Sequence, residues 1–124
     1  MDFGTFVKIR RRAMGLTLRE FCRRNGFDPG NISRYERGIV SPPVSAKARR
    51  AYAKALGISA GSVEWREFHD LAALWAGRLP TDMASDKAVL SMLPLIFCAR
   101  REKQSEAQWD WLIALILRQL LQDI

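Results

Sequence analysis

The sequence predicts an all-α protein of 124 residues. Apolar residues recur three and four positions apart along most of the chain, which is the spacing of one face of a helix. Capping boxes at Thr17-Glu20 and Ser105-Gln108 are typical of helix starts. No segment of the sequence alternates convincingly between apolar and polar residues, as a half-buried strand would. We therefore expect a series of helices joined by short turns.

Each helix is predicted from its apolar positions and its ends. The first covers about residues 2–13, and Gly15 then supplies the conformational freedom that a helix end needs. Pro42 and Pro43 exclude regular structure from the loop that follows the third helix. Beyond this loop we expect four helices, over about 45–56, from Ser62 to Ala76, over about 86–101, and from Ser105 to about Asp123. In the third of these, Ser85 is the expected cap and Pro94 is expected to kink or break the helix.

Two short helices separated by a tight turn are predicted within residues 17–38. Gly26 breaks the pattern between them, and Asp28 offers an N-cap oxygen to the second helix. Ile32 and Tyr35 are expected to face inward, whereas the residues between them are polar and face out. Two helices, a tight turn and a polar second helix describe a helix-turn-helix, whose second helix enters the major groove of DNA.

This stretch resembles the Cro/repressor (XRE-type) helix-turn-helix family over roughly the first half of the chain. The residues that carry the resemblance are Gly15-Leu16, Thr17, Glu20, Gly26, Ile32, Glu36-Arg37-Gly38 and Ala55-Leu56-Gly57. It implies a lambda-repressor-like DNA-binding domain, which we assign to residues 1–58, and a helical extension over residues 59–124. It also implies a semi-buried pair of Arg11 and Glu36 that holds the first helix to the recognition helix.

The outer face of the recognition helix contains the predicted base contacts. Asn31 and Arg34 are the main ones, because Asn pairs bidentately with adenine and Arg with guanine. Ser33, Pro29 and Gly30 occupy neighbouring positions, where a proline can contact a thymine methyl and a glycine allows close approach of the backbone. The alternative is that these residues form only an exposed polar face of a helix.

Phosphate contacts position such a protein on DNA and supply most of its affinity. The resemblance places them at Thr17 and Leu18, and Arg19, Arg37 and the loop residue Ser41 are further candidates. Backbone N–H groups at the start of a helix attract a phosphate, which accounts for Thr17 and Leu18. For the two arginines, an ordinary solvated charge is the alternative.

The basic charge of the chain lies in the half that contains this motif. Residues 1–65 hold thirteen Lys/Arg and five Asp/Glu, a net charge of +8, whereas residues 66–124 hold seven and eight, a net charge of −1. A module that binds a polyanion requires such an excess. The coincidence of charge and motif favours double-stranded DNA as a partner.

The last predicted helix is apolar nearly all the way round. Its main face contains Trp109, Leu112, Ile113, Ile116, Leu117 and Leu120. A helix of this kind is normally buried, and this small chain has little protein of its own to cover it. Since members of the family bind two half-sites, we expect a homodimer. A helix folded back on its own domain, or a toxin or peptidase partner, is the alternative.

The sequence gives little evidence for an enzyme or a metal-binding protein. His69 is the only histidine, and no second group of metal ligands accompanies it. Phosphate-binding glycine motifs are also absent, so we expect neither enzymatic activity nor a cofactor. Cys22 and Cys98 are expected to be small buried residues in a reducing compartment. The sequence contains no signal peptide or membrane-spanning run, so we expect a cytoplasmic protein, of bacterial or phage type by resemblance.

The sequence therefore predicts a dimeric, sequence-specific DNA-binding transcriptional regulator, most simply a repressor of its own or a neighbouring operon. The alternative is an antitoxin or adaptor whose main role is protein–protein interaction. A membrane-surface protein is disfavoured, because the apolar last helix contains Glu106 and Asp110 and only one cation, Arg118.

Overall fold

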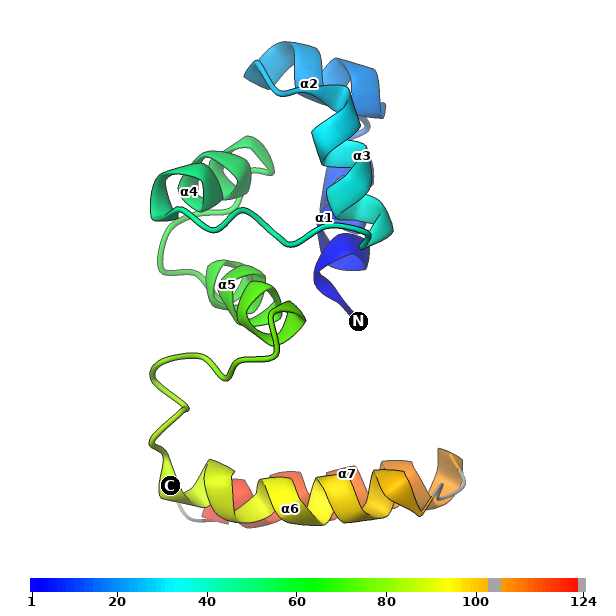
Figure 1. Cartoon of the computed structure of the whole chain (residues 1–124), viewed down its shortest axis with the longest axis vertical. Coiled ribbons are helices and arrows are strands. Elements are labelled where there is room, and N and C mark those ends of the chain that lie inside the picture. Colours follow the sequence, from blue (N-terminus) through cyan, green and yellow to red (C-terminus); the bar gives the residue numbers. More distant parts are fainter. Residues whose placement is uncertain (103–105, 123–124) are drawn as a thin grey trace. The chain divides into compact units, whose positions relative to one another are not determined.

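The computed structural model describes residues 1–102 and 106–122 of the chain. Helices, turns and loops make up these two ranges, and no strand occurs in them, which confirms the all-α class (Figure 1). The chain divides into two compact units, Met1–Pro80 and Thr81–Ile124. Within the described residues, five helices belong to the first unit and two belong to the second.

Each helix of the first unit begins after an Asp, Ser or Thr residue that caps it. At each start, a side-chain oxygen of the N-cap residue accepts a hydrogen bond from the backbone N–H three residues later. These caps are Asp2, Thr17, Asp28, Ser45 and Ser62. The five helices are α1 (Phe3–Ala13), α2 (Leu18–Asn25), α3 (Pro29–Arg37), α4 (Ala46–Ala55) and α5 (Val63–Trp75).

Tyr52 of α4 lies at the centre of an aromatic core. Its ring is surrounded by five others with centroids 5.8–6.2 Å away, those of Phe3, Phe21, Phe27, Tyr35 and Phe68. These rings come from α1, α2, the α2–α3 turn, α3 and α5. Burial raises the pKa of the Tyr52 hydroxyl far above its usual value. One side chain therefore connects all five helices of the unit.

Helix α5 is part of this same core. Phe68 and Ala72 are fully buried, and the Phe68 ring lies 5.1 Å from that of Phe3 on α1. The domain boundary predicted between residues 58 and 59 therefore falls inside the first compact unit, which ends at Pro80. The residues that resemble the helix-turn-helix family end before α5, so they give no sign that this helix packs on α1.

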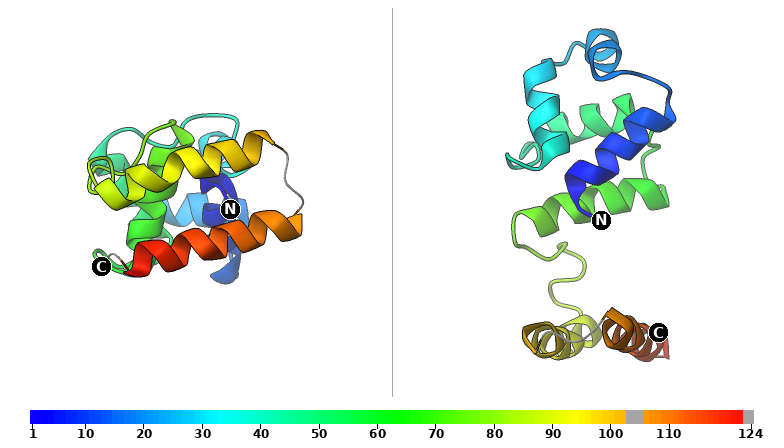
Figure 2. Two further views of the ribbon diagram at one scale, coloured as in Figure 1. Left: turned by 90° about the horizontal axis from the view of Figure 1, so that it is seen from below. Right: turned by 90° about the vertical axis from the view of Figure 1, so that its right-hand side faces the viewer.

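The second unit is a hairpin of two antiparallel helices, α6 (Lys87–Arg101) and α7 (Glu106–Gln122). Figure 2 shows them side by side in one view and end-on in the other. At the connected end of the hairpin, the Arg100 guanidinium lies over the Trp109 ring, 5.5 Å from its centroid. None of the helices in the described part of the chain is long and apolar enough to cross a membrane.

Three expectations for the second unit need correction or fall outside the structure. Asp86, rather than Ser85, caps α6, because its carboxylate accepts the Val89 N–H at 3.1 Å. The helix also continues through Pro94, so the predicted break does not occur, while the predicted kink stays a prediction. Pro94 has no N–H to donate to the carbonyl of Leu90, which is exposed to solvent. The predicted cap at Ser105 lies outside the described residues.

The two cysteines differ in their surroundings. Cys22 is buried in the core of the first unit, as predicted, and burial raises the pKa of its thiol. Cys98 is exposed, so the prediction that it is buried was wrong. In a hairpin, α7 covers only one side of α6, and a residue on any other side stays in contact with solvent.

Candidate nucleic-acid interface

Helices α2 and α3 are joined by a tight turn over residues 26–28 (Figure 1). Gly26 takes a left-handed conformation with a φ of 69°, which a residue with a side chain rarely adopts. Asp28 then caps α3, its carboxylate accepting the Asn31 N–H at 3.1 Å. Ile32 is buried and Tyr35 is partly buried against the core, so the remaining side of α3 faces solvent.

The predicted base-contact residues lie on this solvent side of α3. Asn31 and Arg34 are both exposed, and the Arg34 Nη1 atom donates a hydrogen bond to the Asn31 Oδ1 atom at 2.8 Å. Pro29 and Gly30 are exposed in the first turn of the helix, and Ser33 is half-buried. The carboxamide and the guanidinium, the two groups suited to bidentate base pairing, are therefore adjacent.

The start of α2 contains three of the predicted phosphate contacts. Thr17 is the exposed N-cap, and its hydroxyl oxygen accepts the Glu20 N–H at 3.2 Å. Arg19 is exposed in the first turn, whereas the Leu18 side chain packs against the core. Leu18 can therefore offer only its backbone N–H, one of the first in the helix and without a partner inside it.

The other two predicted phosphate contacts, Arg37 and Ser41, lie at the end of α3 and in the loop after it. Both are exposed, and the Arg37 Nε atom donates to the Ser33 carbonyl at 3.4 Å. The loop is held to α4 by Arg49, whose guanidinium donates to the Pro43 carbonyl. This contact fixes the loop in which Ser41 is presented.

Arg11 and Glu36 form the ion pair that the family resemblance implies. The Arg11 Nη2 atom lies 2.7 Å from the Glu36 Oε1 atom, and only 9% and 6% of the two side chains are exposed. Hydrogen bonding to Glu36 raises the pKa of Arg11. The Arg11 Nη1 atom also donates to the Leu16 carbonyl at 2.9 Å. One guanidinium thus connects α1, the approach to α2 and the last turn of α3, and so fixes the recognition helix.

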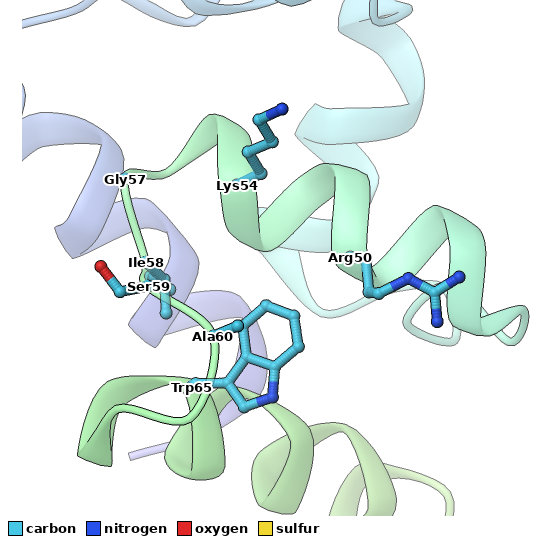
Figure 3. Close-up of a pocket in the computed structure, with 7 residues that line it drawn as sticks. All are labelled: Arg50, Lys54, Gly57, Ile58, Ser59, Ala60 and Trp65. Atoms are coloured by element: carbon cyan, nitrogen blue, oxygen red, sulfur yellow. The ribbon is translucent and has the colours of Figure 1, made fainter.

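A second group of cations, which sequence reasoning did not include in the site, lies on α4. Lys47, Arg50 and Lys54 are exposed and spaced three and four apart, so they share the solvent face of the helix. Arg50 and Lys54 border a hollow of about 490 Å³ beside Trp65 (Figure 3). In Figure 3 the Lys54 side chain points away from the Trp65 ring. Their regular spacing is the signal that would have identified these cations.

The electrostatic contrast between the two halves of the sequence holds for the two compact units. Residues 1–80 hold fifteen Lys/Arg and seven Asp/Glu, a net charge of +8, whereas residues 81–124 hold five and six, a net charge of −1. The unit that contains the helix-turn-helix is therefore the one suited to a polyanion.

Comparison with known proteins agrees with this geometry. The sequence profile of the helix-turn-helix domain family matches residues 2–65, which include α1–α4 and the start of α5. No curated protein and no solved structure gave a match. The matched residues make up more than half of the chain. The chain therefore belongs to the helix-turn-helix domain family, which includes DNA-binding regulators of the Cro/repressor type that it resembles.

Proposed function

We propose that this protein is a sequence-specific DNA-binding transcriptional regulator that represses its own or a neighbouring operon. The observation that carries this proposal is the pairing of Asn31 with Arg34 on the exposed side of a helix-turn-helix recognition helix. With α3 in the major groove, Asn31 would read an adenine and Arg34 a guanine. Repression would follow from occupancy of an operator that overlaps a promoter.

The rest of the proposed interface positions α3 on the duplex. Thr17, Arg19 and Arg37 lie at the start of α2 and the end of α3, on either side of the base-contact residues in the sequence. Phosphates bound at these places would fix the register of the helix, while the positive charge of the unit would raise affinity for any DNA. Specificity would then depend on the few side chains of α3 that reach base edges.

We also propose that the protein acts as a homodimer, paired through the hairpin of the second unit. A hairpin of two helices cannot enclose its own apolar side chains. Within the described part of α7, Trp109 and Ile113 are half-buried, whereas Leu117 is 53% and Trp111 is 67% exposed. The predicted face also includes three residues whose side chains the structure does not describe, Leu112, Ile116 and Leu120.

A second copy of the hairpin would cover this surface as a four-helix bundle. Among the side chains that the structure describes on these two helices, the large apolar ones exposed to solvent are Leu90, Leu95, Phe97, Trp111, Leu115, Leu117 and Leu121. A dimer would also place two recognition helices on successive half-sites of an operator. An antitoxin or adaptor role, with a different protein on this surface, is the second candidate function, and the same exposed residues favour it.

DNA binding can be tested with the double substitution Asn31→Ala/Arg34→Ala. The wild-type protein is first used to select duplexes from a random-sequence pool, and affinity is then measured at fixed salt against scrambled competitor. We expect the double substitution to abolish the preference for the selected duplex while leaving weak general binding. Arg66→Ala, which removes a charge from the exposed side of α5, is the matched control and should keep the preference. Equal affinity for selected and scrambled DNA in the wild-type protein would contradict sequence-specific regulation.

Dimerisation can be tested by sedimentation of the full chain with Trp111→Glu/Leu117→Glu. We expect the wild-type protein to sediment as a dimer and the variant as a monomer, because buried charges would oppose pairing of the hairpins. Ala13→Glu, at an exposed position in the first unit, is the control and should remain dimeric. A wild-type monomer that binds a different protein through the same residues would favour the antitoxin or adaptor role instead.

A further inference from the structure

A cavity of about 160 Å³ lies between the recognition helix and α4. The buried residues Ile32 and Tyr52 line it from α3 and α4, and Ala48 and Ala51 line it where they face solvent. Small side chains on this side of α4 keep the cavity open. An apolar cavity of about 150 Å³ is large enough to hold a benzene ring, so the size suits a single aromatic ring.

Three aromatic rings line the cavity. The Phe27 and Tyr35 rings lie 6.0 Å and 5.8 Å from the Tyr52 ring, measured between centroids. Aromatic rings pack on one another in tilted or edge-to-face arrangements, and a further ring in the cavity can pack on these three in the same way. The lining therefore favours a planar aromatic compound over an aliphatic one of the same volume.

Two polar side chains restrict the chemistry of the ring further. Asp28 and Asn31 also line the cavity, and both are exposed at the start of α3. A carboxylate accepts hydrogen bonds and repels an anion, so it favours a neutral hydroxyl or amino group over a carboxylate on the ring. The Asn31 Oδ1 atom, which now accepts from Arg34, can accept from such a group instead.

We propose that this cavity binds a neutral single-ring aromatic compound with a hydroxyl or amino group, and that such a ligand weakens DNA binding. The coupling rests on the proposed function, because Asn31 lines the cavity and is also the predicted adenine reader. A ligand that holds the Asn31 carboxamide withdraws it from the base edge. By linkage, DNA that holds Asn31 weakens the affinity for the ligand by the same factor.

The site itself can be tested without DNA, with phenol as the probe. Phenol is titrated into the full chain while the methyl resonances of Ala48 and Ala51 are followed by NMR. We expect the resonances of both methyls to shift saturably with phenol. The affinity for benzoate should be at least about tenfold weaker than that for phenol. Ala51→Leu fills the cavity and should weaken phenol binding at least about tenfold. Ala46→Leu, at an exposed α4 position that does not line the cavity, should bind phenol like the wild type.

Shifts that do not saturate, or that are equal in Ala51→Leu and the wild type, would overturn the site. The coupling is tested by measuring affinity for the selected duplex with and without saturating phenol. We expect phenol to weaken wild-type binding to the selected duplex at least about fivefold, the lower end of the range typical of coupled sites, and to leave that of Ala51→Leu unaffected. Saturable phenol binding with unchanged DNA affinity would overturn the coupling. If the wild-type protein prefers no duplex, the regulator proposal fails, while the phenol titration still decides the site.

Discussion

Gly4 on α1 and Glu36 on α3 lie so close together that a Cβ atom on Gly4 would be 2.6 Å from the Glu36 carbonyl oxygen. The Tyr35 carbonyl oxygen is at the same distance from that Cβ position. Both atoms belong to the backbone of the recognition helix, so neither can move without moving α3. The absence of a side chain at Gly4 therefore sets how closely α1 approaches α3.

Replacement of Gly4 with alanine should destabilise the protein by about 2 to 3 kcal/mol, the cost of forcing an extra methyl into a packed interface. Urea denaturation followed by circular dichroism measures this change. Gly30→Ala is the matched control on α3, because its Cβ would meet only the ends of the Asp28 and Arg34 side chains, at 3.2 Å and 3.6 Å. This control should lose little stability or gain up to about 1 kcal/mol. Equal losses for both variants would contradict the close approach of α1 and α3.

Removal of either partner of the Arg11–Glu36 pair should destabilise the protein. Arg11→Ala leaves the Glu36 carboxylate almost fully buried without its partner, which typically costs about 3 to 5 kcal/mol. The double variant Arg11→Met/Glu36→Leu removes both charges and should be more stable than either single truncation. A double-mutant cycle on the free energy of unfolding, with Arg11→Met and Glu36→Leu as its single variants, measures this coupling. Additive losses would show that the two side chains do not act as a pair.

The salt dependence of DNA binding should identify the phosphate contacts. Each contact that is lost should reduce the slope of log affinity against log salt by about 0.9, because one fewer counterion is released from the duplex. We expect this reduction for Arg19→Gln and for Arg37→Gln. Arg101→Gln removes the same charge from an exposed position at the end of α6 and should leave the slope unchanged. An equal reduction for Arg101→Gln would mean that net charge, rather than contact, determines the slope.

His69 should make the stability of the first unit depend on pH. The imidazole is half-buried, and its centroid lies 4.8 Å from that of the Trp65 ring and 5.3 Å from that of the Phe68 ring. Burial lowers the pKa of His69, and the positive charge of Arg49 lowers it further. The negative charge of Asp70 partly opposes this decrease. The unfolded chain therefore binds a proton more readily than the folded one. The contribution to stability is complete above about pH 6.5 and decreases below it, until folded His69 is protonated too.

The variant His69→Gln tests this dependence, since the chain contains no other histidine. We expect the free energy of unfolding to decrease less in the variant than in the wild type between about pH 7.5 and about pH 5. Urea denaturation at several pH values measures both curves, and the carboxylates titrate alike in the two proteins. Parallel curves would exclude a contribution from His69.

The first unit shows what local sequence can predict. Capping residues such as Thr17 and Ser62, and turn glycines such as Gly26, act within a few residues of their own position. Their effects can therefore be read from the sequence, and the structure confirms them. The Arg11–Glu36 pair spans 25 positions and was predicted only because the residues match a family pattern.

Longer-range packing could not be predicted in the same way. Nothing near Phe68 indicates that its ring meets that of Phe3, because that contact depends on how the whole chain folds. The cavity between α3 and α4 likewise requires small residues at Ala48 and Ala51, opposite rings that lie elsewhere in the sequence. In the second unit, apolar spacing predicts the two helices but not which of their sides stays exposed, as Cys98 shows.

The division of the chain at Pro80 separates the proposed base-contact residues from the apolar surface of α6 and α7. A substitution on α3 therefore changes the first unit, which contains the aromatic core around Tyr52, and a substitution on the hairpin changes the second. If the proposed function and dimer hold, two copies that arise by gene duplication could diverge in operator preference while still forming mixed pairs. They could also stop pairing with each other while keeping the same operator. Operator preference and the choice of dimer partner would then evolve independently of each other.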